Sequence, residues 1–385
     1  MESLDVAHRT TLFRELQLIP GHVFEKLERR HKVGRASRKF GFKEQFTVIA
    51  FFMLSACSTM REGIRNLSSI PGRLYHWGLE KVTRSTFSDA INKRPYAFFE
   101  DLFSEMYKLC ANSAPQKPFK FNCKLYSFDS TTISLCLSLF PWATFRRRKG
   151  GIKMHTLLDH DGCIPAFVEI SEAKTHDSKM AQALKLQKGS IVACDRGYVS
   201  FSWFHSLCEQ GVYFVTRLKK NMKFKLLERN AVKVETGVTS DHVIEIQHKN
   251  QKILLRKIGF LAPDTGNFMY FLTNNFQLEA QVIASIYKER WKIELFFKEI
   301  KQTLKIKHFF GDSENAVRTQ IFTALTIYLL LSWQKFLSRT GWSVLQILQL
   351  IKGKLLENMS MLDLLSPEDK KKDFYNNTKW LYLIP

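Results

Sequence analysis

The chain has 385 residues, of which 45% are hydrophobic. This composition excludes a disordered protein and allows two or three structural units around a sizeable core. The formal net charge of +22 at pH 7 predicts a polyanionic partner, and nucleic acid fits better than a membrane surface because the positive charge is spread along the chain. The seven cysteines are scattered without a C-x-x-C pair, which argues against a disulfide framework or a zinc site and fits a reducing cytoplasm.

The first part of the chain, residues 1–110, has the pattern of short helices separated by breaks such as Pro71-Gly72. Basic residues are dense between Arg29 and Lys43. Two interpretations remain open, a DNA-binding module similar to a helix-turn-helix or a helical cap with a solvated basic face. Residues 111–121 are polar and contain two prolines, so we predict a linker there.

Strand patterns begin after this linker and extend over residues 122–218. Two short strand patterns, residues 125–128 and 190–194, are each followed at once by an aspartate, Asp129 and Asp195. Such an aspartate is either a turn residue or a carboxylate placed to bind a metal ion. Between them, the turn signal at residues 159–162 predicts a β-hairpin.

A basic loop at residues 141–151 also lies between the two aspartates. Its cations can contact phosphate groups, and the alternative is a solvated charge run. The cations concerned are Arg146, Arg147, Arg148 and Lys149.

Residues 219–275 change character, with short alternating runs separated by turn signals such as residues 263–266. This pattern predicts a mostly β insertion. Residues 276–340 then have helical periodicity, and residues 341–385 predict a helical C-terminal tail. The apolar stretch at residues 321–333 is too short to cross a bilayer and predicts a buried helix.

Four polar residues of the segment 287–301 fall within an arc of roughly 60° beside the apolar stripe of the predicted helix. They are Tyr287, Arg290, Glu294 and Lys301. A carboxylate flanked by two cations and a phenol suits a divalent metal ion held near phosphate groups. The alternative is a solvated helix with ion pairs at i,i+4, such as Arg290–Glu294.

The spacing of these four residues resembles the Y-R-E-K motif of DDE transposases of the IS-four family of bacterial insertion sequences. The segments FDSTTI, around Asp129, and DRGY, which starts at Asp195, resemble the first two acidic motifs of that family. The resemblance implies that Asp129, Asp195 and Glu294 form a catalytic triad that also binds metal. It implies that the other three residues of the Y-R-E-K motif hold the DNA backbone.

The resemblance also implies an architecture. An α/β fold with an RNase H-like catalytic core would occupy residues 122–218 and 276–340. The β insertion of residues 219–275 would interrupt this core, and a helical N-terminal DNA-binding region would precede it. The hard carboxylate ligands fit Mg²⁺, with Mn²⁺ as a substitute, and two ions would serve in-line phosphoryl transfer.

The activity implied by the resemblance is cut-and-paste transposition, in which element ends are cut and joined to target DNA through a hairpin intermediate. The implied partners are double-stranded DNA, comprising terminal inverted repeats and target, and a second copy of the chain in a homodimer; no membrane partner is expected. The expected location is a prokaryotic cytoplasm, at the nucleoid when the protein is bound to DNA. Two other interpretations remain open, an RNase H-like nuclease that cuts without joining and a domesticated, non-catalytic DNA-binding protein.

Overall fold

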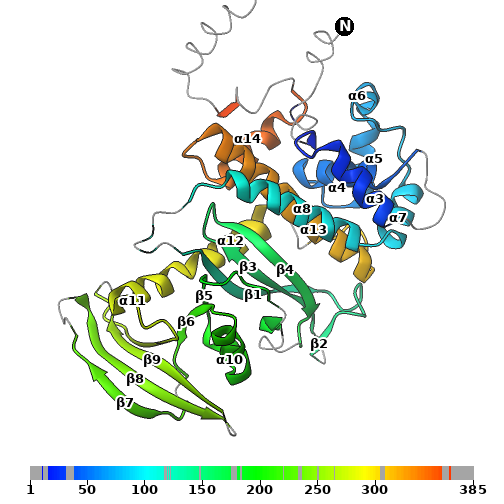
Figure 1. The fold of residues 1–385 in the computed structure, drawn as a ribbon. Helices are drawn as coiled ribbons and strands as arrows, with labels where there is room; N and C mark the ends of the chain where they lie inside the picture. The colour runs from blue at the N-terminus through cyan, green and yellow to red at the C-terminus, as the bar shows by residue number, and fades with distance from the viewer. Residues whose placement is uncertain are drawn as a thin grey trace, which may run out of the picture. The chain divides into compact units, whose positions relative to one another are not determined.

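The structure is a computed structural model, and Figure 1 shows its fold. The chain divides into two compact units, one comprising residues 1–115 with 299–385 and the other comprising residues 116–298. The structure describes residues 11, 16–31, 39–116, 119, 121, 123–146, 149–174, 180–182, 184–219, 221–232, 236–248, 251–263, 265–303, 308–357 and 364–365.

The first unit is helical. A side-chain cap begins several of its helices, as at Thr83, whose hydroxyl accepts the amide hydrogen of Thr86. The helical character predicted for the N-terminal region is therefore confirmed, whereas its role in DNA binding stays a prediction. The helices are α3 (Gly21–Arg30), α4 (Phe42–Leu54), α5 (Met60–Ser68), α6 (Pro71–His76), α7 (Arg84–Lys93), α8 (Ala97–Ser113), α13 (Glu314–Ser338) and α14 (Val344–Lys354).

The long helix α13 forms the core of this unit. It is buried around most of its circumference and packs against α4, α7, α8 and α14. Its length and composition would allow it to cross a membrane, but most of its apolar stretch is buried inside the protein, as in the core helix of a globular unit. The buried helix predicted at residues 321–333 is confirmed.

The second unit is built on a mixed sheet of ten strands, counted over the described residues. The strands β4, β3 and β1 pair antiparallel, and β5 and β6 continue the sheet parallel to β1. The resulting order, β4-β3-β1-β5-β6, is the RNase H-like core that the resemblance implied. The strands are β1 (Leu125–Leu135), β2 (Thr144–Arg146), β3 (Lys149–Asp159), β4 (Ile164–Glu172), β5 (Ile191–Cys194), β6 (Tyr213–Arg217), β7 (Lys225–Asn230), β8 (Val238–His248), β9 (Gln251–Leu261) and β10 (Phe268–Thr273).

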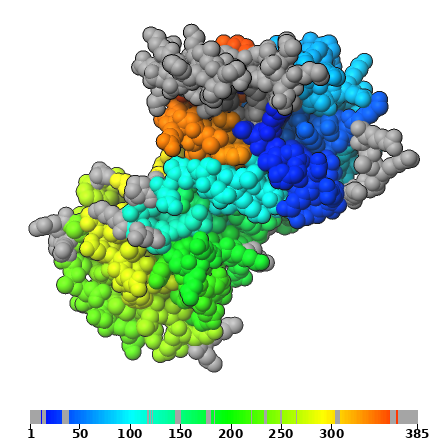
Figure 2. Space-filling model, turned by 45° about the horizontal axis from the view of Figure 1, so that its top comes forward, coloured from blue at the N-terminus to red at the C-terminus, as the bar shows by residue number. Residues whose placement is uncertain are grey.

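The insertion between the second and third acids is mostly β, as predicted, and it extends the core sheet instead of forming a separate one. Strand β10 pairs antiparallel with β6, and β9, β8 and β7 follow outward. The yellow-green residues of these strands form part of the surface of this unit in Figure 2.

Strand β1 is longer than the sequence pattern predicts. The prediction that the strand ends at Asp129 is wrong, because β1 stays paired with β3 as far as the pair Leu135–Gly150. What does end at this point is the parallel pairing of β1 with β5, whose last pair is Phe128–Cys194. The predicted hairpin is confirmed as β3 and β4, with Gly162 in the left-handed region at φ 71°.

Helices cover both faces of this sheet (Figure 1). Helix α11 (Ala280–Glu289) packs Ile283 and Ile286 against a cluster that includes Phe271 of β10. Helix α10 (Phe201–Glu209) packs on the opposite face, where Phe204 stacks on Phe214 of β6.

Helix α11 ends at Glu289, and α12 (Trp291–Thr303) begins after the single residue Arg290. The boundary between the compact units falls after Lys298, within α12. Residues 299–340, which the sequence assigned to the catalytic core, thus group with the helical unit, because α13 buries its surface against α4, α7 and α8.

Candidate active site

The parallel register of β1 and β5 brings two of the predicted acids together. Phe128 and Cys194 are paired, so Asp129 and Asp195 follow at the same edge of the sheet. Carboxyl ends of neighbouring parallel strands meet at one edge, which is where α/β proteins commonly place their sites. Asp195 then leads into a short 3₁₀ turn, Arg196–Tyr198, and its carbonyl accepts the amide hydrogen of Tyr198.

Arg290 connects the helical acid to the strand acid. Its Nη1 donates a hydrogen bond of 2.8 Å to Oδ2 of Asp129, and its Nη2 donates one of 2.8 Å to Oε1 of Glu294. The Arg290 side chain is only 13% exposed, so these contacts lie largely away from solvent. The break between α11 and α12 therefore places a guanidinium between carboxylates that belong to different elements.

The three acids act on one another electrostatically. Burial raises the pKa of Asp129 from 3.8 to about 6, against the lowering effects of the Ser130 amide and Arg290. The negative charges of Asp195 and Glu294 raise this pKa further. Burial is thus the main cause of the raised pKa of Asp129, and a divalent cation bound at this carboxylate would lower that pKa again.

Tyr287 lies beside this group. Its ring centroid is 5.5 Å from the guanidinium carbon of Arg290, and the side chain is buried. Burial raises the pKa of its phenol, Arg290 lowers it, and Asp195 and Arg217 also contribute. The hydroxyl of Tyr287 thus stays protonated near neutral pH and can donate a hydrogen bond.

Arg217 is a site residue to which the sequence analysis gave no role. It is the last residue of β6, the strand parallel to β5, so it lies at the same edge of the sheet as the two aspartates. Its effect on the pKa of Tyr287 places its charge near the site. The signal that marks it in the sequence is a cation directly after a buried strand that follows the second acid.

The other predicted DNA contacts stay predictions. Lys301 lies on α12 about two turns after Glu294, beyond the boundary of the second unit. Arg147 and Arg148 fall outside the described residues, and the structure places only the backbone of Arg146 and Lys149, at the ends of β2 and β3.

The chemistry of the three acids fits a hard divalent cation, because all of their donor atoms are carboxylate oxygens. Among the described residues, no three acidic, histidine or cysteine side chains are close enough to enclose a metal ion as they stand. Arg290 holds one oxygen of Asp129 and one of Glu294. The second oxygen of each carboxylate, Oδ1 of Asp129 and Oε2 of Glu294, is not held by the guanidinium.

The family of transposase DDE domains matches residues 124–330 of this chain, and a domain family of unknown function matches residues 8–80. The first match spans all three acids together with Tyr287 and Arg290.

Similar proteins include one from Sinorhizobium fredii named as transposase y4zB, 33% identical over 70% of this chain and 76% of that protein. A protein of Geobacillus stearothermophilus named as the transposase of insertion sequence IS5377 is 29% identical over 77% of this chain and 78% of its own length. A Synechocystis protein named as the transposase of insertion sequence IS4SA is 28% identical over 73% and 80%. Among solved structures, the piggyBac transposase synaptic complex with hairpin DNA is similar at a TM-score of 0.44 and 10% identity, over 98% of this chain and 86% of that one.

Proposed function

The chain belongs to the family of transposase DDE domains, and we propose that it mobilises an insertion sequence by cutting the element's ends and joining them to target DNA. Family membership makes it an enzyme that acts on DNA and depends on divalent metal ions. The observation that carries the proposal is that three acids from separate elements lie close to one another: Arg290 bonds both Asp129 and Glu294, and Asp195 lies beside Asp129 at the same edge of the sheet.

We assign the three carboxylates as ligands of two Mg²⁺ ions, for which Mn²⁺ can substitute. The chemistry that such ions would supply when bound is activation of a water or a 3′-hydroxyl and neutralisation of the leaving oxygen of an in-line displacement. The protein's part is to hold the ligands in place. Asp129 is held by its pairing with Thr156 of β3, directly after the last pair of β1 with β5, and Glu294 lies in the first turn of α12.

Arg290 takes two partners in turn. Without DNA, its guanidinium neutralises Asp129 and Glu294. Once those carboxylates bind cations, the same two N–H groups become available for the oxygens of the scissile phosphate, to which a planar guanidinium binds in a bidentate manner. Tyr287 and Lys301 hold the neighbouring phosphates of the backbone.

We further propose a hairpin intermediate, supported by a cavity beside the Y-R-E-K residues. The cavity has a volume of about 500 Å³, and its lining is mainly apolar. It lies between the insertion, which contributes Phe260 and Met269, and the helices, which contribute Tyr287 and Trp291. A sharply bent DNA end has to extrude a base, and a space of this kind, with the 58% exposed Trp291 at its edge, can receive one.

Joining both ends of an element requires a catalytic centre at each end. We therefore propose that two copies of the chain act as a homodimer on paired terminal inverted repeats. We also propose the prokaryotic cytoplasm as its location, at the nucleoid where its double-stranded DNA partner lies.

The test is incubation of the purified protein with a labelled duplex that ends in the element's terminal repeat, in the presence of Mg²⁺ or Mn²⁺. Denaturing gels would separate nicked, hairpin and joined products. Wild type should give all three, and Asp129→Asn and Glu294→Gln should give none while still retarding the duplex. Glu279→Gln, at an exposed glutamate directly before α11, should behave as wild type.

Each of the other outcomes points to a different function. Nicked products without joined ones would identify a nuclease and overturn the proposal of strand joining. Binding without any metal-dependent product would identify a non-catalytic DNA-binding protein. Loss of folding in Glu294→Gln would assign this residue to a structural ion pair.

A further inference from the structure

Three basic side chains form a row across the insertion sheet. Arg229 of β7 is paired with His242 of β8, and His242 is paired with Lys257 of β9. Residues directly opposite one another in neighbouring strands project from the same face of a sheet. We call these three residues the basic row; it lies on the face opposite α11.

No carboxylate balances the basic row within the sheet. The register places no aspartate or glutamate of the described strands β7–β10 on this face. The pKa of His242 is lowered by burial and then by the charges of Lys257 and Arg229, whereas Asp241, on the opposite face, raises it. The imidazole is therefore neutral near neutral pH, and Arg229 and Lys257 carry the charge of the basic row. No acidic side chain of this face offsets the charges of Arg229 and Lys257, so the basic row suits an anionic partner.

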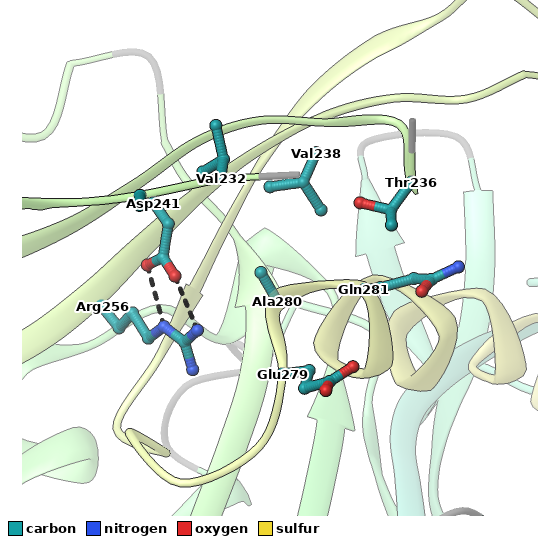
Figure 3. Close-up of a pocket in the computed structure, with 9 residues that line it drawn as sticks. Val232, Thr236, Val238, Asp241, Arg256, Glu279, Ala280 and Gln281 are labelled. Atoms are coloured by element: carbon teal, nitrogen blue, oxygen red, sulfur yellow. Dashed lines mark hydrogen bonds and ion pairs between the residues drawn. The ribbon is translucent and has the colours of Figure 1, made fainter. Parts of the chain in front are cut away.

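The other face of the same strands is arranged differently. There Arg256 forms two hydrogen bonds with Asp241, at 2.9 and 2.6 Å, beside a cavity of about 220 Å³ at the start of α11 (Figure 3). On that face Lys252 also lies 3.3 Å from Glu245. The cations of one face thus have acidic partners within the sheet, whereas the basic row of the other face does not.

Exposed aromatic rings lie at the Lys257 end of the basic row. The ammonium of Lys257 lies 4.2 Å from the ring centroid of Tyr270 and 4.8 Å from that of Phe224. Phe268 meets Tyr270 edge to face at 4.8 Å and is 49% exposed. Large exposed aromatic groups gathered around a lysine without an acidic partner on its face of the sheet mark a binding surface.

We propose that this face binds an unpaired DNA strand, with phosphates on the basic row and bases stacked on Phe224, Phe268 and Tyr270. Proteins that bind single strands combine a cationic track with aromatic side chains in this way, and rings displayed on a sheet serve as stacking platforms. The bases of an intact duplex are stacked on one another, so the rings favour a strand that has lost its partner. The inference rests on the proposed function, since cutting and joining expose such strands next to the element end.

The test is fluorescence anisotropy of the full chain, without metal ions, on a labelled oligothymidine of about 20 nucleotides and on a duplex of the same length, at several salt concentrations. Lys257→Gln keeps the aliphatic stem over Tyr270 and removes only the charge. It should weaken single-strand binding and reduce the magnitude of the slope of log affinity against log salt concentration by about 0.7. Phe268→Ser should weaken single-strand binding about tenfold without changing that slope, and it should affect the duplex less.

Lys252→Gln, on the opposite face, is the matched control and should bind both probes as wild type does. Wild-type affinity in Lys257→Gln and Phe268→Ser, with unchanged melting temperatures, would overturn the inference. A change in the oligomeric state of these variants without DNA, measured by sedimentation, would also overturn the inference. It would show that this face is a contact between copies of the chain. Failure of the proposed function would give a different result. The protein would still bind the oligothymidine through the basic row, but it would form no metal-dependent products from the duplex.

Discussion

Nη1 of Arg290 donates a 2.8 Å hydrogen bond to Oδ2 of Asp129 across a sequence separation of 161 residues. The same guanidinium binds Glu294, its neighbour one helical turn away. The contact to Asp129 ties the junction of α11 and α12 to strand β1. Arg290 thus links the strand acid to the helical acid before any substrate is present.

Removal of the Arg290 charge should destabilise the protein in the absence of metal. Arg290→Ala leaves a largely buried carboxylate without its partner, which costs about 1–3 kcal/mol of unfolding free energy. Arg290→Lys should recover only part of this loss, because an ammonium does not bridge two carboxylates as a planar guanidinium does. Urea unfolding with a chelator measures both. In an Asp129→Asn background the effect of Arg290→Ala should shrink, and equal losses in the two backgrounds would contradict the pairing.

The stability of the metal-free protein should depend on pH through Asp129. Folding raises the pKa of this carboxyl from 3.8 to about 6, so between these values the folded state holds a proton that the unfolded state has lost. The resulting stabilisation is complete below about pH 4 and is lost as the pH rises through about 6. Relative to wild type, Asp129→Asn should therefore gain up to about 3 kcal/mol across this window. Parallel stability–pH curves for the two proteins would show that the shift is absent.

A buried hydrogen bond between Ser127 and His160 should be needed for stability. The two side chains are fully buried, and Ser127 Oγ lies 2.7 Å from His160 Nε2; on the other side of the ring, Nδ1 lies 3.7 Å from Oε2 of Glu289. Ser127→Ala leaves a ring nitrogen without its partner and should lower the unfolding free energy by about 1–3 kcal/mol.

Thermal or urea unfolding measures this loss. Ser202→Ala, an exposed serine on α10, serves as the control and should stay within about 0.5 kcal/mol of wild type. Because Ser127 is two residues before Asp129 and Glu289 precedes Arg290, metal-dependent cleavage by the folded variant should fall as well. Unchanged stability together with unchanged cleavage would remove this contact from the support of the site.

The ion pair of Asp241 and Arg256 should stabilise the junction between the insertion and α11. Arg256 also donates hydrogen bonds to the carbonyls of Asn275 and Leu278, just before that helix. Arg256→Met should destabilise the protein by about 3–5 kcal/mol, since it leaves Asp241 charged and buried. Adding Asp241→Leu should restore part of this loss in the same unfolding assay. A further loss in the double variant would show that the two side chains do not act as a pair.

Local patterns in the sequence account for most of the elements. The hairpin at residues 159–162 requires only a turn signal between apolar runs, and the β character of residues 219–275 requires only short alternating runs. The bounds of β1 were not predictable in this way, because residues 130–135 remain extended through their pairing with β3. The basic row was also not predictable from local patterns, because Arg229, His242 and Lys257 come together only through the register of three strands.

Local signals in the sequence were enough to predict the family and the three candidate acids. Their signal is short-range, comprising the spacing of Tyr287, Arg290 and Glu294 along one helix and the aspartates that follow two apolar runs. The tertiary structure decided how these groups meet. It paired Phe128 with Cys194, so that Asp129 and Asp195 are neighbours, and it turned Arg290 toward Asp129 as well as toward Glu294. Strand register and the break between α11 and α12 depend on which apolar faces are buried together, and contacts between distant segments settle that choice.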